Sequence, residues 1–359
     1  MRALTVVPGR AGTARLEEVA EPSLEDGPLL IEALALGVCG TDLEIVEGRY
    51  GSAPPGRERL ILGHETIGRV LEAPRGGDLA PGDLIVGIVR RPDPVPCPCC
   101  AVGEWDMCRN GRYTERGIKE RDGYCSERYR IDPTFAVKVD PKLGRLGVLL
   151  EPASVLAKAW EHIERIGLRA HWEPRRVLVT GAGPIGMLAA LMGVQRGLEV
   201  HLLDRVAEGS KPALARELGA IYHVGESFEC GADSGMDVVI ECTGIGEVVL
   251  DAIRCGAPGG IVCLTGMSSG HRELALDIAG LNRSMVLEND VIFGSVNSNR
   301  RHYEAGADAL LRADAGWLGR LISRRVPLAR WAEALDRRPD DIKTVIDLVA
   351  EGPTEPGSA

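Results

Sequence analysis

Residues 37–65 of the sequence carry side chains that can bind a transition metal. Cys39 is followed by Asp42, and a Gly-His-Glu triplet that ends with His64 and Glu65 comes after a loop rich in proline and glycine. A thiolate, an imidazole and carboxylates are the ligands that zinc takes in proteins. Cys39 and His64 are 25 positions apart, so only folding can bring them together. Taken alone, the two residues also fit a buried thiol and an ordinary core histidine.

A second group of cysteines lies in the proline-rich stretch 92–110. Cys97, Cys100 and Cys108 have the spacing C-x2-C-x7-C, which is a plausible closed zinc lobe. A fourth cysteine is missing from the place where a four-thiolate site needs it. Asp93 or Cys99 can supply the fourth ligand, and the alternative is that the lobe binds no metal.

Residues 177–204 have the pattern of a dinucleotide-binding unit. A compact apolar strand, Val177–Thr180, runs into Gly-Ala-Gly-Pro-Ile-Gly at 181–186, a helical stretch follows, and the next strand ends on Asp204. The glycines allow a tight turn close to a pyrophosphate, and the helix N-terminus binds its charge. The candidate cofactor-binding residues that go with this unit are Gly181, Gly183, Pro184, Ile185, Gly186, Asp204, Arg205 and Thr243.

Asp204 and Arg205 make opposite predictions about the nicotinamide cofactor. Asp204 can accept hydrogen bonds from the adenosine ribose and repels a 2′-phosphate, which favours NAD. Arg205 can hold that phosphate or stack on adenine. We expect NAD or NADP, with NAD preferred.

The length and composition indicate a soluble globular protein of two domains. The chain has 359 residues, and 45% of them are hydrophobic. With 42 basic and 52 acidic side chains, its formal net charge at pH 7 is 42 − 52 = −10. An acidic chain without a basic tract is a poor nucleic-acid binder. We find no apolar run long enough for a membrane span and no signal-peptide pattern, so a cytoplasmic protein is expected.

The order of strands and helices predicts an α/β protein. The first third is β-rich, and Thr41 or Asp42 is expected to cap a short helix after the strand at 30–36. Strands alternate with helices from about residue 155 to 295, which indicates a doubly wound parallel sheet. The tail from Ser295 ends in a strand and is expected to pack back on the first domain. The expected division is 1–154 with 296–359, and 155–295.

Together, these motifs resemble the zinc-dependent medium-chain alcohol dehydrogenases over essentially the whole chain. The segments GVCGTDLEIVEG, LGHETIGRV, YTERGIKERDGY, LLEPASV and GSVNSN resemble the glucose 1-dehydrogenase branch in particular. The resemblance implies a GroES-like β-rich catalytic domain and a Rossmann dinucleotide-binding domain. It also implies transfer of hydride from C1 of an aldose, D-glucose above all, to NAD(P), giving gluconolactone.

The resemblance assigns the catalytic zinc site residue by residue. Cys39 and His64 match the family's zinc ligands, and Glu65 matches a glutamate that is a ligand in some states and lies outside the ligand shell in others. Glu151 stands where many relatives have a cysteine ligand. Asp42 matches the carboxylate that orients the histidine.

Three further residues match positions that handle the substrate. Thr41 matches the hydroxyl that bonds the substrate oxygen and passes its proton outward. Glu115 and Asn297 fall where the glucose branch contacts sugar hydroxyls and the nicotinamide region, with Glu151 beside them. Glu115 fits a surface ion pair equally well, because several arginines are near it in the sequence.

The departures from the family leave the substrate open. Val155 replaces an acid that contacts sugar in some members, and Glu44 stands where several relatives carry a relay histidine. The alternatives are a zinc-dependent polyol, cyclitol or secondary-alcohol dehydrogenase and, in another class, a non-catalytic nucleotide-binding scaffold. A homodimer or homotetramer is expected, since the edge strand near 291–294 suits sheet extension.

Overall fold

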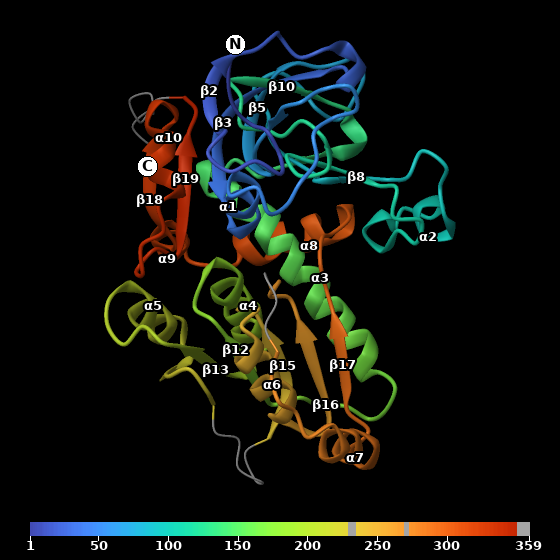
Figure 1. The fold of residues 1–359 in the computed structure, drawn as a ribbon, viewed down its shortest axis with the longest axis vertical. Coiled ribbons are helices and arrows are strands. Elements are labelled where there is room, and N and C mark those ends of the chain that lie inside the picture. The colour runs from blue at the N-terminus through green and yellow to red at the C-terminus, as the bar shows by residue number, and fades with distance from the viewer. Residues whose placement is uncertain (229–234, 269–272, 350–359) are drawn as a thin grey trace.

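The computed structural model describes residues 1–228, 235–268 and 273–349. A β-rich half and a half built on a parallel sheet are stacked along the long axis of the molecule (Figure 1). Helix α3 (Leu150–Gly167) runs from the first half along the second. No helix in the described ranges is long and apolar enough to cross a membrane.

The β-rich half is organised around strand β3 (Leu29–Val38), which has antiparallel neighbours on both sides. Its sheet has the order β11-β6-β5-β3-β19-β18, and β10 also pairs with β3. The other strands of this sheet are β5 Glu65–Glu72, β6 Leu84–Gly87, β10 Arg128–Ile131, β11 Ala136–Lys138, β18 Ile322–Pro327 and β19 Lys343–Asp347. Because β19 pairs with β3, the C-terminal segment joins the sheet of the first half, which is the packing expected for the tail.

Smaller elements complete this half and its edge. Two three-stranded sheets have the orders β2-β1-β4 and β7-β8-β9. Their strands are β1 Arg2–Val6, β2 Arg15–Glu18, β4 Leu60–Ile61, β7 Arg90–Arg91, β8 Thr114–Arg116 and β9 Glu120–Arg121. The helices are α1 Gly40–Val46, α2 Pro98–Ala101, α8 Arg300–Leu311, α9 Ala315–Leu321 and α10 Trp331–Leu335. The short 3-10 helices are η1 Leu24–Asp26, η2 Trp105–Met107, η3 Pro133–Phe135, η4 Gly144–Leu149 and η5 Leu328–Arg330.

The second half is a six-stranded, all-parallel sheet of the order β14-β13-β12-β15-β16-β17. This is the strand order of dinucleotide-binding Rossmann folds, so the predicted fold class is confirmed. The strands are β12 Arg176–Thr180, β13 Glu199–Asp204, β14 Ile221–Val224, β15 Met236–Glu241, β16 Gly256–Leu264 and β17 Val291–Gly294. The helices are α4 Pro184–Val194, α5 Ser210–Leu218, α6 Gly246–Arg254 and α7 Ile278–Glu288.

Alternate residues of these strands enter two different cores, as the period of a strand requires. Val177 and Val179 of β12 pack in the large core that α3 and α4 share. Leu178, between them, packs in a smaller core with Ala252 of α6. The sheet is therefore covered on both faces, which explains why its strands read as continuous apolar runs.

One local prediction is wrong. The N-cap of α1 is Cys39, and neither Thr41 nor Asp42. The carboxylate of Asp42 reaches back and accepts a hydrogen bond from the Cys39 amide, at 2.9 Å. Asp42 thus occupies the third helical position of a capping box, and the capping residue is the cysteine before the helix.

Candidate active site

Strand pairing brings Cys39 and His64 together. In the antiparallel pair of β3 and β5, Gly37 lies opposite Glu65, so the residues that follow β3 meet those that precede β5. The Cys39 Sγ and the His64 Nε2 are 3.1 Å apart. Ligand atoms of Cys39, His64 and Glu65 all lie within 4.8 Å of one another. His64 and Glu65 are buried, and Cys39 is half-buried.

Two carboxylates act on this group from neighbouring elements. The Asp42 Oδ1 lies 3.5 Å from the His64 Nδ1, on the side of the ring away from Cys39. Glu151, in the first turn of α3, is buried and lies outside the group of three. Its burial raises its pKa to about 7, against the opposing effect of His64. Thr41 is half-buried in the first turn of α1, between Cys39 and Asp42.

The titrations of the thiol and the imidazole are coupled. Burial raises the pKa of the Cys39 thiol, although the nearby His64 works against it. Burial lowers the pKa of His64, but the charges of Cys39 and Asp42 hold it well above its ordinary value. A metal ion needs both groups deprotonated, so metal binding here would release protons.

The glycines at 181–186 form a tight turn between β12 and α4. Gly181 has a φ of +85°, and Gly183 is the N-cap of α4. A Cβ on Gly186 would lie 1.7 Å from the carbonyl oxygen of Gly181, so only glycine allows this close packing. Pro184 occupies the first helical turn, where its missing N–H costs no helical bond. The amides at the start of α4, including that of Ile185, can then face a phosphate.

Asp204 ends β13 next to this turn. Its Oδ2 accepts a hydrogen bond from the Ala182 amide at 2.7 Å, and its Oδ1 accepts from the Val206 amide at 2.9 Å. The Lys211 Nζ is 3.8 Å from the Oδ2. Asp204 therefore also braces the glycine turn, a role that the sequence did not reveal.

The other candidate cofactor residues lie at the same end of the sheet. Thr243 follows β15, and its methyl group would lie 2.9 Å from a Cβ placed on Gly181. Arg205 is exposed directly after β13. The structure thus places both residues near the glycine turn.

Glu115 and Asn297, which are 182 positions apart, meet at the junction of the two halves. The Asn297 Nδ2 donates to the Glu115 Oε1 at 2.7 Å. Arg90 donates to the same oxygen through its Nε at 3.0 Å. Glu115 and Arg90 are both buried, so Glu115 is not in a surface ion pair. Arg90, which sequence reasoning missed, fixes the direction of this carboxylate.

Comparisons with known proteins decide the family. The family model described as glucose dehydrogenase C-terminus matches residues 144–348, and that of the alcohol dehydrogenase GroES-like domain matches residues 25–141. The glucose 1-dehydrogenase of Methanocella arvoryzae is 40% identical, over 98% of this chain and 100% of that protein. The glucose 1-dehydrogenase of Thermoproteus tenax is 38% identical, over 97% of this chain and 99% of that protein. The chain belongs to the glucose dehydrogenase branch of the zinc-dependent medium-chain alcohol dehydrogenases.

A solved structure of this branch shares the whole fold. It is the Haloferax mediterranei glucose dehydrogenase in complex with NADP, Zn and gluconolactone. Its TM-score is 0.89 at 30% identity, over 98% of this chain and 100% of that chain.

The donor set of this glucose dehydrogenase family member fits zinc. A thiol, an imidazole nitrogen and a carboxylate converge in a buried place, and they are the ligand types that zinc prefers. Among the described residues, the Nδ1 of His64 and the Oδ1 of Asp42 are buried without a hydrogen-bond partner. A metal on the Nε2 would fix the ring so that its Nδ1–H faces that carboxylate.

Lys343 is a residue of this site that sequence reasoning missed. It begins β19, is fully buried, and forms an ion pair with Glu65. A Cβ on Gly37 would lie 2.2 Å from the Glu65 Oε2 and 2.7 Å from the Lys343 Cε. Gly37 therefore leaves room for this pair. The only signal in the sequence is a lysine at the start of an apolar strand, which does not name its partner.

The cysteine lobe gathers three of its candidate ligands. Ligand atoms of Cys97, Cys100 and Cys108 lie within 4.8 Å of one another. The Cys97 Sγ accepts hydrogen bonds from the Cys100 and Arg109 amides, at 3.5 and 3.4 Å. The amides of Arg109 and Cys100 lower the pKa of the Cys97 thiol to about 6, which favours the thiolate that a metal needs.

The two candidates for a fourth ligand lie outside that cluster. The Asp93 Oδ1 accepts from the Val95 amide at 2.8 Å, and its Oδ2 accepts from the Arg112 Nε at 3.2 Å. Both oxygens of Asp93 are thus already used. Cys99 is half-buried and does not join the group of three.

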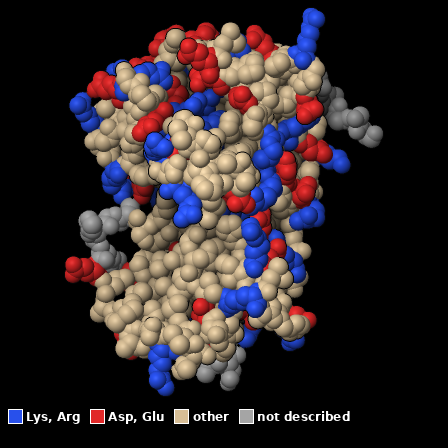
Figure 2. Space-filling model, turned by 90° about the vertical axis from the view of Figure 1, so that its right-hand side faces the viewer, with Lys and Arg blue, Asp and Glu red and all other residues tan. Residues whose placement is uncertain are grey.

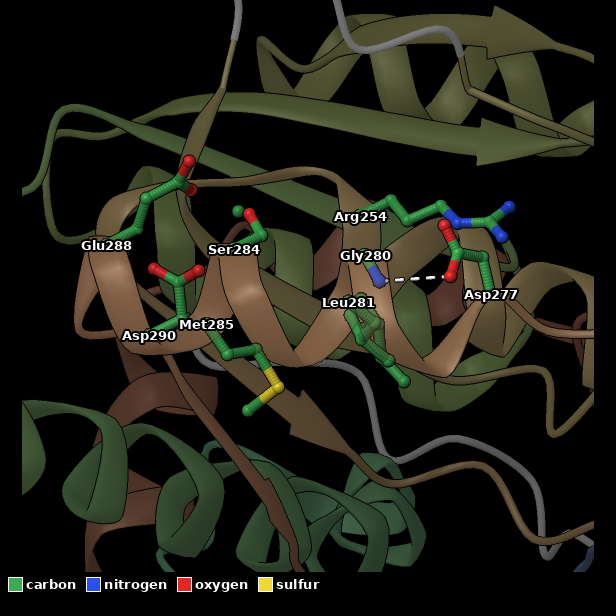
Figure 3. A pocket seen from close by; sticks show the side chains of 10 residues that line it. Arg254, Asp277, Gly280, Leu281, Ser284, Met285, Glu288 and Asp290 are labelled. Carbon is green, nitrogen blue, oxygen red and sulfur yellow. Dashed lines mark hydrogen bonds between the residues drawn. The ribbon is translucent and has the colours of Figure 1, made fainter.

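A cavity of about 280 Å³ lies between α6 and α7 (Figure 3). Its wall includes Arg254, Asp277, Ser284 and Asp290. The Asp277 Oδ1 caps α7 by accepting from the Gly280 amide at 3.0 Å. None of the candidate site residues lines this cavity, so it is not the active site.

Proposed function

We propose that the protein is a zinc-dependent aldose 1-dehydrogenase, with D-glucose as its leading substrate and NAD(P) as hydride acceptor. The observation that carries the proposal is the buried cluster of Cys39, His64 and Glu65 at the junction with a dinucleotide-binding sheet. The reaction converts an aldose and oxidised nicotinamide into the lactone, reduced nicotinamide and a proton. The relatives named glucose 1-dehydrogenase and the Haloferax complex with gluconolactone support this substrate class.

The residues divide the work by position. Zinc bound by Cys39, His64 and Glu151, with Glu65 as a further ligand or a close neighbour, would lower the pKa of the C1 hydroxyl. Asp42 orients the His64 ring. The Thr41 hydroxyl accepts a hydrogen bond from the C1 hydroxyl and, as it takes that proton, releases its own proton toward solvent.

Other residues hold the two reactants. Glu115 and Asn297 bind sugar hydroxyls at the junction of the halves, where they already contact each other. The glycine turn at 181–186 and the N-terminus of α4 hold the pyrophosphate. We propose two domains, one made of residues 1–154 with 296–359 and the other of residues 155–295. Closure of the second domain on the first would bring the sugar and the nicotinamide together.

We infer that NAD is the preferred cofactor. The Asp204 carboxylate ends β13 and repels a 2′-phosphate. Lys211, at 3.8 Å from that carboxylate, and the exposed Arg205 act in the opposite direction, and the Haloferax relative carries NADP. The ratio of kcat/KM for the two cofactors tests the inference, and a strong NADP preference would overturn it.

A panel of aldoses, polyols, cyclitols and secondary alcohols, assayed with NAD and NADP through the absorbance of the reduced nicotinamide, tests the function. We expect D-glucose or a related aldose to give the highest kcat/KM. A higher value for a polyol would replace the proposed substrate. Absence of turnover on every alcohol, together with absence of zinc, would identify a non-catalytic nucleotide-binding protein.

We infer that the chain forms a homodimer or homotetramer through β17. Among the described strands, β17 pairs only with β16, so one of its edges is free. The adjacent α7 buries none of its residues and exposes Ile278, Val286 and Leu287. The part of the surface over β17 and α7 carries few charged side chains (Figure 2). Light scattering after size exclusion tests this; a monomer would contradict it.

The thiols of the two clusters suit a cytoplasmic setting. Cys39, Cys97, Cys100 and Cys108 are free cysteines, and metal-binding thiols stay reduced in that compartment.

A further inference from the structure

The segment 296–299, between β17 and α8, is held in an uncommon conformation. Asn297 has a φ of +64°, in the left-handed region that few non-glycine residues adopt. Its Oδ1 accepts a hydrogen bond from the Ser298 amide at 2.8 Å, and its Nδ2 points to Glu115. Ser298 and Asn299 are buried. A strained backbone persists only where its surroundings hold it.

Side chains on one face of α3 form the first group of contacts that fix the segment 296–299. Glu151, Ser154 and Lys158 are spaced three and four residues apart, so they share one side of the helix. The Ser154 and Ser298 hydroxyls are 2.6 Å apart, and the Lys158 Nζ donates to the Val296 carbonyl at 3.0 Å. The helix that carries the candidate zinc ligand Glu151 thus also fixes the segment.

The cysteine lobe supplies the second group of contacts. Asp106, in η2 of the lobe, forms an ion pair with Lys158, with 2.9 Å between Oδ2 and Nζ. Its Oδ1 accepts from the Asn299 Nδ2 at 2.7 Å, and its backbone carbonyl accepts from the Arg90 Nη1 at 2.9 Å. The side chains of Lys158 and Asp106 are 2% and 0% exposed. One aspartate therefore connects α3, the 296–299 segment and the arginine that orients Glu115.

We propose that Asp106 and Lys158 are positioning residues for the sugar and nicotinamide side of the active site. They hold 296–299 so that Asn297 stays against Glu115, at a fixed place relative to Glu151. This rests on the proposed function, because it assigns Asn297 and Glu115 to the substrate. A buried ion pair contributes little net stability compared with an apolar pair of the same size, but its directional bonds define one geometry for the segment.

Three substitutions test the pair. Asp106→Asn keeps the shape and leaves Lys158 without its counter-charge, and Lys158→Met removes the charge and the bond to the Val296 carbonyl. Asn299→Ser keeps a capping side chain for α8 but is too short to reach Asp106, and it leaves no buried charge unpaired. Asn299→Ser can therefore still test the role of Asp106 in holding 296–299 if the other two variants fold poorly.

We expect each folded variant to lose about tenfold to hundredfold in kcat/KM for the aldose, because a misplacement near 1 Å has that effect. Zinc content should stay near the wild-type value, since no zinc ligand is changed, and the Kd of the reduced nicotinamide should rise less than the KM of the aldose, since the glycine turn that binds the pyrophosphate is intact. Hydrogen exchange of the peptide covering 294–299 should become faster in all three.

Arg301→Gln is the matched control. Arg301 also connects α8 with α3 and the lobe, through Glu161 at 3.1 Å and Glu104 at 3.3 Å, and both of these ion pairs lie outside 296–299. It should lower the melting temperature slightly and leave kcat, KM and the exchange of 294–299 unchanged.

The outcomes separate the two proposals. Asp106→Asn and Asn299→Ser with unchanged kcat/KM and unchanged exchange would overturn the positioning role, whatever their melting temperature. A wild-type chain that oxidises no aldose would overturn the proposed function instead. In that case, faster hydrogen exchange of 294–299 in the three variants, but not in Arg301→Gln, would still show that Asp106 and Lys158 fix the segment 296–299. Equal exchange rates in all four proteins would show that they do not.

Discussion

The Glu65 carboxylate forms a buried ion pair with the Lys343 ammonium group, and this pair joins two strands that flank β3. Glu65 begins β5 and Lys343 begins β19. Burial lowers the pKa of Lys343, but the charge of Glu65 outweighs this effect and keeps that pKa above its usual value. The last strand of the chain thus contributes a charge next to the candidate zinc ligands.

Lys343→Met should destabilise the protein strongly. The substitution keeps the length of the side chain but leaves the Glu65 carboxylate buried without its partner. Loss of one member of a buried pair costs roughly 3–5 kcal/mol. Chemical denaturation followed by circular dichroism measures the free energy of unfolding.

The double variant Glu65→Gln with Lys343→Met is the control for that prediction, because it removes both charges. It should recover part of the lost stability. A single variant as stable as the wild type would show that Glu65 has another partner for its charge.

Cys39→Ala and His64→Ala should each abolish turnover and remove the catalytic zinc. Each substitution deletes one donor from the group of three. Elemental analysis of the purified protein gives zinc per chain, and the aldose assay gives kcat. Cys263→Ala, at a buried cysteine in the core of the parallel sheet, is the matched control. Full activity in a zinc-free Cys39→Ala protein would end the assignment.

Glu115→Gln and Asn297→Ala should act on the sugar more than on the cofactor. A hydrogen bond to a charged group contributes about 1.5–3 kcal/mol, so we expect kcat/KM for the aldose to fall roughly tenfold to hundredfold in Glu115→Gln. The KM of the nicotinamide should change far less. Equal losses for both reactants would place Glu115 in the general support of the fold.

Local signals in the sequence predict the order of elements and the cysteine lobe, whereas Cys39, His64 and Glu65 could be assigned to one site only through the resemblance to the family. The glycine turn at 181–186 needs its glycines for a contact within six residues, and the apolar periods mark the buried strands. The resemblance placed Glu115 and Asn297 in one site, but their direct contact and the Glu65–Lys343 pair could not be predicted, since each joins residues from distant parts of the chain. Only the register of β3 with β5 and β19 brings Glu65 and Lys343 together.

The cysteine lobe should bind one zinc ion with Cys97, Cys100 and Cys108. Cys100→Ser is expected to lower the zinc content by about one ion per chain and to lower the melting temperature, since a structural zinc contributes to folding. Catalytic zinc should remain. Asp93→Ala should leave the zinc content unchanged, because both oxygens of Asp93 are bonded elsewhere. Loss of one zinc ion in Asp93→Ala would instead make Asp93 the fourth ligand.

His302 should make the stability depend on pH between about 4 and 6.5. Burial lowers the pKa of His302 to about 4, although Asp106 and Glu161 act in the opposite direction. The unfolded chain, with an ordinary pKa near 6.5, therefore binds the proton more readily than the native protein in this window. The stability that His302 contributes is present above about pH 6.5 and is lost as the pH falls toward 4. The shift corresponds to at most about 3 kcal/mol.

His302→Asn isolates this contribution from that of the carboxylates. In the wild type the His302 Nδ1 accepts a hydrogen bond from the Asn299 amide at 3.1 Å, and an asparagine oxygen can take over that bond without titrating. The free energy of unfolding should thus fall less steeply in the variant than in the wild type between pH 6.5 and 4. Parallel curves for the two proteins would mean that the pKa of His302 is not lowered in the native state, because the Glu161 carboxylate 3.1 Å away offsets the effect of burial.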